Sequence, residues 1–368
     1  MSTLSPFPAE ASSPDKVAAK LKKTLVRRVG ADRSQQVRRA VQIALLLLNA
    51  AIGVQFILWV RYFESGGATH YVGRPAGVDG WLPIAGLMNL RYFLAVGKIP
   101  PIHPSAMVLL CVFLLASVLV KKAFCSWLCP VGTVSEFLWK LGRKVFKRNL
   151  LVPKGLDVPL RGVKYLLLGF FVYIVFTMPA MDLGDFLASP FGIVADVKML
   201  NFFRYMDTVG LMVVLVLVAL SVVVENFWCR FLCPYGALMG IVSALSPVKI
   251  RRDAEACIDC GKCNKACPSQ LPVDRLVQIR SVECTGCMEC VAACPAENAL
   301  QMALMPRKAE AAAARWRGRV LKPRMVAAVL AIVFFGLIGA ARATGHWQTN
   351  LPREVYMQLV PNAENFDH

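Results

Sequence analysis

The chain carries five long apolar segments, separated by polar and basic stretches. They cover residues 41–60, 105–120, 163–181, 208–224 and 325–343, and the second can extend through Ala123. A helix needs about 20 mostly apolar residues to cross the hydrocarbon core of a bilayer. The pattern therefore predicts an all-α polytopic membrane bundle with about five transmembrane helices.

Basic residues mark alternate sides of these segments. Many Lys and Arg residues lie between the second and third segments, whereas the next connection has only Lys198 and Arg204 beside several aspartates. Because cytoplasmic loops are enriched in Lys and Arg, the basic side is predicted to be cytoplasmic. We therefore expect a multi-pass protein of the bacterial inner (cytoplasmic) membrane. Its basic arm (1–39) and basic linker (306–324) would be cytoplasmic, the fifth helix would cover 325–343, and the short tail (344–368) would be periplasmic.

Composition narrows the class of protein. The 368 residues are 57% hydrophobic with a net charge of +19, and the mean hydropathy is +0.53. This is too apolar for a soluble globular protein of this size. The basic residues stand in blocks beside the apolar segments, as membrane orientation requires. The predicted partner is the lipid bilayer, and nucleic acid is not expected as a partner.

The cysteine pattern between residues 257 and 295 indicates the chemistry. It reads CIDCGKCNKACP and then, from residue 284, CTGCMECVAACP. In each C-x2-C-x2-C-x3-C-P run three cysteines hold one 4Fe-4S cluster, and the fourth holds the other cluster. A disulfide framework gives no reason for the doubled spacing, and zinc sites favour paired C-x2-C units with a longer insert.

Two 4Fe-4S clusters are therefore predicted in a cytoplasmic, α+β, two-cluster ferredoxin-like domain at 250–305. The predicted ligands of the first cluster are Cys257, Cys260, Cys263 and Cys294. Those of the second cluster are Cys284, Cys287, Cys290 and Cys267.

A different cysteine motif occurs twice in the predicted four-span membrane domain at 40–249. Residues 124–132 read FCSWLCPVG and residues 228–236 read WCRFLCPYG, a constant offset of 104 positions. Pro130 and Pro234 suit the first position of a helix, which places Cys129 and Cys233 at helix N-termini. Free N–H groups and the helix dipole favour the thiolate form there.

A pseudo-symmetric bundle can bring four such cysteines together: Cys125, Cys129, Cys229 and Cys233. They suit a third iron-sulfur site, another soft-metal site or a dithiol–disulfide pair. The alternative is a structural role at buried helix starts. The pattern leaves this choice open. The remaining cysteine, Cys111, is predicted to serve packing inside the second apolar segment.

Together these features resemble the NapH-type membrane 4Fe-4S ferredoxins. The resemblance rests on twelve cysteines that match in order and spacing between residues 40 and 305. Relatives are the membrane half of the regulator NosR and the CcoG-type cytochrome oxidase accessory proteins. The resemblance implies electron transfer between the quinone pool, with quinone as substrate, and an unidentified redox protein partner, as in a quinol dehydrogenase component. CcoG-type members imply an alternative, copper reduction in oxidase maturation, and a redox-sensing membrane regulator is a third hypothesis.

The predicted outer loop at 62–104 is a candidate quinol site. It places Arg74, Asp79, Arg91 and His103 among apolar and aromatic residues. Quinol oxidation needs groups that accept protons beside an apolar slot. The alternative interpretation is an amphipathic lid with solvated charges.

Overall fold

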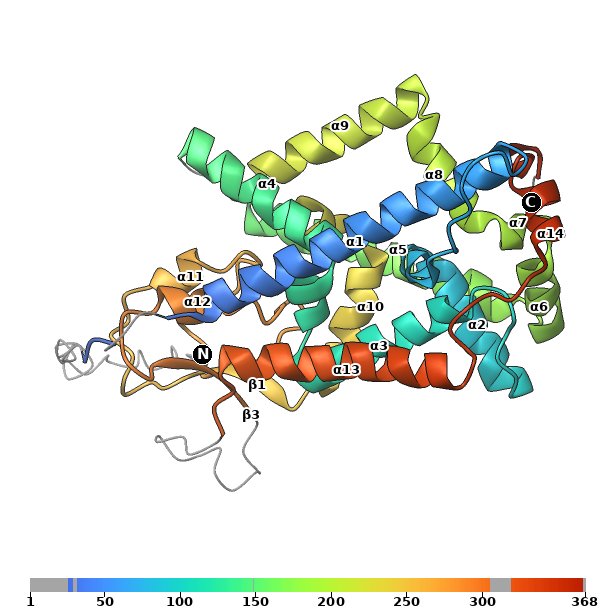
Figure 1. Ribbon diagram of the computed structural model, residues 1–368. Coiled ribbons are helices and arrows are strands. Elements are labelled where there is room, and N and C mark those ends of the chain that lie inside the picture. The colour runs from blue at the N-terminus through green and yellow to red at the C-terminus, as the bar shows by residue number, and fades with distance from the viewer. Residues whose placement is uncertain (1–25, 29–31, 148, 305–318, 367–368) are drawn as a thin grey trace, which may run out of the picture.

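The computed structural model describes residues 26–28, 32–147, 149–304 and 319–366. Most of the predicted basic arm and most of the basic linker therefore lie outside the described residues. The described chain is a helical membrane protein with one small sheet (Figure 1).

Three helices are long and apolar enough to cross a membrane, and they agree with three of the predicted segments. They are α1 (Ser34–Glu64), α5 (Lys154–Thr177) and α13 (Pro323–Ala343). A fourth crossing is available if α8 (Ala195–Arg204) and α9 (Thr208–Val223), which are bent by 83° at their junction, are counted as one span.

The other two predicted spans form shorter helices. Helix α3 (Pro104–Val120) has 17 residues, and α9 alone has 16. Helix α3 stops early because its flanking residues, His103 and Lys121, both adopt left-handed backbone with positive φ. The five-span count is therefore not reproduced by helix length among the described residues.

Helix α3 forms the centre of the molecule. It packs against η2 (Ala76–Trp81), α2 (Pro83–Val96), α10 (Pro234–Val242) and α13. Close approach to α2 depends on Gly86, because a Cβ there would lie 2.8 Å from the carbonyl oxygen of Ala106. The apolar run of α3 is thus explained by burial among other helices as well as by a membrane.

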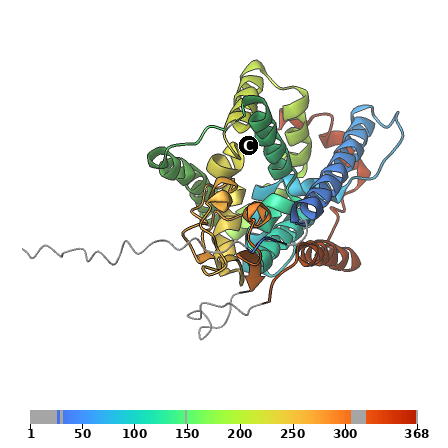
Figure 2. The same cartoon turned by 90° about the vertical axis from the view of Figure 1, so that its left-hand side faces the viewer.

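Residues 248–304 form a separate unit at one end of the helices (Figures 1 and 2). Its antiparallel sheet has the order β2-β1-β3, formed by β1 (Val248–Arg252), β2 (Gln278–Ile279) and β3 (Leu300–Leu304). Ile250 pairs with Ile279 on one side and with Met302 on the other. The short helices α11 (Lys262–Lys265) and α12 (Glu289–Ala293) complete the unit.

The opposite end is built from connections and the C-terminal segment. It contains α2, α6 (Ala180–Ala188), α7 (Pro190–Ile193) and α14 (Arg353–Leu359) (Figure 1). Trp59 of α1 packs edge-on against Tyr356 of α14, with ring centroids 5.1 Å apart. The C-terminal segment and the 248–304 unit therefore lie at opposite ends of the helices, whereas residues 26–28 pair with the unit through Arg27 and Ala296.

Candidate metal centres

The two C-x3-C-P motifs fold into matching turns. Each forms a single π-helical turn, η3 (Phe124–Leu128) and η4 (Trp228–Leu232), which leads directly into a helix. The N–H of Cys129 donates to the carbonyl of Phe124 at 2.9 Å, and that of Cys233 donates to Trp228 at 3.0 Å. The following helices, α4 (Pro130–Phe146) and α10, both begin with the motif's proline. Proline suits this position because its missing N–H would have no partner within the helix.

These turns bring four cysteines from the two repeats to one cavity. The cavity has a volume of about 610 Å³, and Cys125, Cys129, Cys229 and Cys233 all line it. The cysteines of the two repeats also interact electrostatically. Cys233 of the second repeat acts on both Cys125 and Cys129 of the first repeat. The structure therefore places the four residues together, as a shared metal site requires.

At Cys129, burial of the thiol outweighs the effect of the helix N-terminus. Burial raises the pKa of Cys129 to about 12 and the charge of Cys125 adds to this, although the N–H groups of Gly132 and Val131 favour the thiolate. Burial likewise raises the pKa of Cys125 to about 11. Burial therefore opposes the thiolate form that the position of Cys129 at a helix N-terminus was predicted to favour. A bound metal would have to displace the thiol protons.

The eight ferredoxin-motif cysteines fall into two spatial groups. Cys267, Cys284, Cys287 and Cys290 line one small cavity, walled also by Ile250 and Ile279 of the sheet. In the other group Cys294 interacts electrostatically with Cys257 and Cys260. Cys263 does so with Cys257 and Cys294.

The two groups differ in one exposed cysteine. Cys260, which belongs to the group with Cys294, is exposed, whereas each group has one buried cysteine, Cys263 and Cys290. Both halves use a glycine with positive φ before the last ligands of the run, Gly261 at 66° and Gly286 at 63°. We refer below to the inner group (Cys267, Cys284, Cys287, Cys290) and the outer group (Cys257, Cys260, Cys263, Cys294). Four cysteines on a common centre fit the ligation of a 4Fe-4S cluster in each group.

The first repeat touches the inner group directly. Ser126 Oγ donates to the carbonyl of Thr285 at 2.7 Å, and Trp127 Nε1 donates to that of Gly286 at 3.2 Å. From α1, Gln35 Nε2 donates to the carbonyl of Cys287 at 3.0 Å. Thr285 and Cys287 also line the large cavity, so the inner group borders the cavity that the four cysteines line.

A buried ion network stiffens this junction. Arg38 of α1 is fully buried and pairs with Glu136 of α4 at 2.5 Å and with Glu289 of α12 at 2.9 Å. Lys140 bridges the same two carboxylates, at 2.5 Å and 2.9 Å. Burial opposes the charge of Glu136, but Arg38 and Lys140 outweigh it and lower the pKa of Glu136 to about 2. Sequence analysis missed this network, because its members are 98 and 251 positions apart in the chain.

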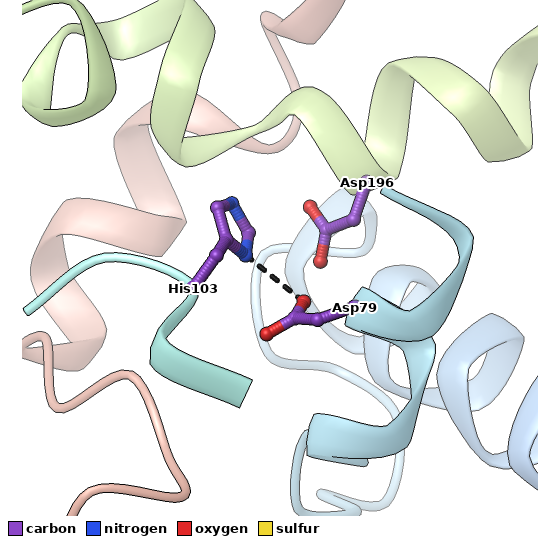
Figure 3. Close-up of side chains that lie close together, drawn as sticks. All are labelled: Asp79, His103 and Asp196. Carbon is purple, nitrogen blue, oxygen red and sulfur yellow. Dashed lines mark hydrogen bonds and ion pairs between the residues drawn. The ribbon is translucent and has the colours of Figure 1, made fainter. Parts of the chain in front are cut away.

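At the end of the helices opposite the 248–304 unit, three of the four polar residues predicted in the outer loop lie together. They are Arg74, Asp79 and His103, and they are joined by Asp196, which was not predicted. Arg74 Nη2 lies 2.5 Å from Asp79 and 2.6 Å from Asp196. His103 Nδ1 lies 2.9 Å from Asp79 (Figure 3). Arg91 is elsewhere, donating to the carbonyl of Val175.

Hydrogen bonding fixes the charges of this group. His103 Nε2 faces the carbonyl of Gly192 at 3.0 Å and must donate to it. His103 Nδ1 lies 2.9 Å from Asp79 and 3.1 Å from Arg74 Nη2, and the charge of Asp79 favours the imidazolium form of the ring. With His103 protonated, two cations balance two anions. Burial lowers the pKa of His103, but the charge of Asp79 outweighs this and raises it.

This group is neither an open cation site nor a base awaiting protons. Ligand atoms of Asp79, His103 and Asp196 lie within 4.8 Å of one another, but the guanidinium of Arg74 already occupies the cation's place between the carboxylates. Burial raises the pKa of Asp79, yet Arg74 and His103 outweigh it and hold the pKa below its usual range. The arrangement ties η2, the start of α3 and the start of α8 together.

Comparison with known proteins agrees with the cysteine geometry. A family model described as a 4Fe-4S binding domain matches residues 102–149 and again 206–253, and one described as a 4Fe-4S dicluster domain matches residues 249–295. The chain is 53% identical over 331 residues to the putative electron transport protein YccM of Escherichia coli, covering 90% of this chain and 91% of that protein.

More distant relatives match a smaller part of the chain. The ferredoxin-type protein NapH of Haemophilus influenzae is 31% identical over 160 residues, which is 43% of this chain and 51% of NapH. The regulatory protein NosR of Pseudomonas aeruginosa is 32% identical over 168 residues, 43% of this chain and 22% of NosR. No solved structure matches the chain.

Proposed function

The chain belongs to the family of 4Fe-4S ferredoxin-type electron transport proteins that includes NapH and YccM, and from this membership we propose that it passes electrons between the membrane quinone pool and a redox protein partner. Two 4Fe-4S clusters, held by the inner and outer cysteine groups, would supply one-electron transfer when bound. The exposed Cys260 places the outer group where a partner protein can approach.

One observation carries the quinone part of this proposal: the shape and lining of the large cavity. It runs from the four cysteines to Arg74 and η2, and apolar side chains of α1, α3 and α13 form much of its wall, among them Leu45, Ile52, Phe113, Phe334 and Ile338. Its volume of about 610 Å³ lies in the ordinary range for organic ligands. An apolar slot that ends beside redox-capable sulfur suits a quinone ring with part of its tail.

The polar residues of the cavity suit the proton side of quinone chemistry. A quinol gives up two electrons and two protons, whereas each cluster takes one electron, so two clusters share the pair. Gln55 and Gln348 line the end of the cavity distant from the cysteines, and Gln348 is exposed. Protons released in the slot can pass to water there. Asp79 and His103 stay committed to their own ion pairs.

We further place the chain in the bacterial inner membrane with five crossings, by α1, α3, α5, α9 and α13. Each of the two short helices is followed, after a break in the helix, by a π-helical turn, η3 ending at Leu128 and η4 ending at Leu232. The cytoplasmic side would carry the 248–304 unit, and the C-terminal segment would lie outside. The charge asymmetry of the loops and the opposite-end placement of these two parts support this orientation.

A second candidate function is reduction of a metal ion such as copper. The four-cysteine cavity favours it, because thiolates are the preferred ligands of Cu(I). The two functions separate in a variant with Cys129→Ser and Cys233→Ser. Metal reduction would be lost with quinone chemistry intact under the second function, whereas quinol-dependent cluster reduction would slow under the first.

The cavity also offers a direct test of the first function. Leu48→Trp places an indole in the lining, and Leu58→Trp makes the same change at an exposed site on α1 outside the lining. We expect Leu48→Trp to slow menaquinol-dependent cluster reduction about tenfold, equivalent to about 1.4 kcal/mol, with dithionite reduction unchanged. Equal rates in the two variants would contradict a quinone site in this cavity.

A further inference from the structure

Four buried lysines, called the lysine layer below, lie near the cysteines of the large cavity and those of the inner group. Lys121 and Lys164 have no exposed surface, Lys249 is 2% exposed and Lys122 is 3% exposed. Loop lysines that merely orient a membrane protein remain in water, because burying an ammonium group without a counter-charge is costly. This layer therefore needs an explanation besides topology.

The described chain supplies one carboxylate to these four cations. Lys164 pairs with Glu283 at 2.5 Å. Lys121 donates to the carbonyls of Arg280 and Ser281, and Lys249 to those of Ser243 and Ala244.

Lys122 is the extreme case. Among the described residues it forms neither an ion pair nor a hydrogen bond, it shares the charge of Glu283 with Lys164, and it lines the large cavity together with the cysteines. Arg230, which directly follows Cys229, adds two more buried donors without partners, Nε and Nη1. An excess of positive charge remains beside the cavity.

The positions of these lysines indicate where a balancing negative charge would bind. The charge of Lys122 acts on Cys125 and Cys229, and those of Lys121 and Lys249 interact with Cys284 of the inner group. The lysine layer is thus flanked by cysteines on both sides. Two anionic centres, one on each face, would neutralise it.

We propose that Cys125, Cys129, Cys229 and Cys233 jointly hold a third iron-sulfur cluster, and that the lysine layer balances its charge. Each repeat supplies only two cysteines to the cavity, so neither matched 4Fe-4S binding segment can hold a cluster alone. Binding exchanges four thiol protons for four sulfur–iron bonds to a preformed core, and the resulting complex is anionic. Free thiols or disulfides are neutral and would leave the lysines without a counter-charge.

The position of this cluster would complete a path through the chain. It would lie at the end of the large cavity that the four cysteines line, next to the inner group, whose Cys287 borders the same cavity and whose loop is hydrogen-bonded to Ser126 and Trp127. Lys122 is in this account a positioning residue that acts on the cluster through its charge. The inference about binding does not depend on quinone as the electron donor, and its tests use dithionite.

Metal content tests the proposal first. The full-length protein is purified anaerobically, and iron and acid-labile sulfide are measured per chain. The double variant with Cys125→Ser and Cys233→Ser should lose the iron and sulfide of one cluster, about a third of the total if all three clusters are cubanes. The control Cys111→Ser, which lies outside the cavity lining, should lose no iron or sulfide. Unchanged iron and sulfide in the double variant would overturn the proposal, as would zinc or copper in place of the expected iron.

A lysine series tests the charge argument without touching a ligand. In a potentiometric titration followed by EPR, Lys122→Met should lower the midpoint potential of the third cluster, because reduction adds negative charge that the ammonium no longer balances. Lys122→Arg should restore most of the shift. Lys198→Met, a lysine that donates to the carbonyls of Ala363 and Phe366 at the far end, should leave the potential unchanged. Equal potentials in Lys122→Met and wild type would contradict the role of the layer.

Discussion

The two repeats share a motif, a π-helical turn and a start-to-start offset of 104 residues, yet their surroundings differ. In the first repeat eleven of the 17 residues of α3 are buried, whereas in the second repeat the buried residue of α9 is Ser221 alone. The helices after the turns differ too, since α4 has 17 residues and α10 has nine. Local sequence thus sets the turn and its cysteines, and the rest of the bundle decides which helix is central.

The repeats also contact opposite halves of the 248–304 unit. The first reaches Thr285 and Gly286 of the second cysteine run. In the second, Arg230 donates to Gln270 at 2.9 Å, just after the first run. Each turn therefore anchors one half of the unit. The two cysteine pairs and the inner group are fixed relative to one another by these contacts.

The largest difference to test is the ion network, which only the first repeat carries. Gly240 stands 104 positions after Glu136, so the second repeat has no matching carboxylate. Arg38→Ala removes a fully buried partner from two half-buried carboxylates, leaves them with Lys140 alone and should destabilise the protein by about 3 kcal/mol. The measurement is chemical denaturation in detergent, with the exposed Arg39→Ala as control. A loss below 1 kcal/mol would show that the network does not hold the junction.

The same network predicts a pH dependence. Because the pKa of Glu136 is lowered to about 2, its ionised form stabilises the fold above the pKa of an unfolded glutamate. This contribution falls as pH drops from about 4.5 toward 2. Glu136→Gln should therefore flatten the stability profile in this window.

An effect of intermediate size on stability is expected at the glycine three positions after each motif's second cysteine. Gly132 and Gly236 occupy this position in the two repeats. A Cβ on Gly132 would lie 2.1 Å from the carbonyl oxygen of Cys125, whereas one on Gly236 would find its nearest neighbour at 3.6 Å. Gly132→Ala must displace the first turn and should cost about 1–3 kcal/mol. Gly236→Ala should be tolerated. Thermal unfolding of both variants checks this, and similar melting temperatures would argue against the close packing of the first turn.

The smallest expected effect comes from making the first turn resemble the second. Trp127→Phe introduces the residue type found at Phe231 and removes the hydrogen bond to Gly286. Leaving that carbonyl unpaired should cost about 1 kcal/mol. Hydrogen exchange around residues 284–287 should quicken in the variant. The reciprocal Phe231→Trp serves as control and should leave exchange in that loop unchanged.

Several parts of this arrangement were predictable from the sequence, and the physical reason is that they are local or periodic. Helices α1, α5 and α13 follow from apolar length, and the paired turns from proline and glycine spacing. The length of α3 did not follow, because an apolar run looks the same whether lipid or protein surrounds it. Asp196 was missed beside Arg74, since 122 positions separate them and no local motif marks Asp196. The lysine layer was also missed, because basic residues near a membrane ordinarily indicate topology.

EPR of the anaerobically purified protein, with excess menaquinol compared with dithionite, tests the central claim most directly. The account predicts that menaquinol reduces the clusters of the wild type and of Leu58→Trp at similar rates, and that it reduces those of Leu48→Trp about tenfold more slowly, whereas dithionite reduces all three alike. If menaquinol leaves the wild-type clusters oxidised while dithionite reduces them, quinol does not supply the electrons, and the proposed direct exchange with the quinone pool is wrong.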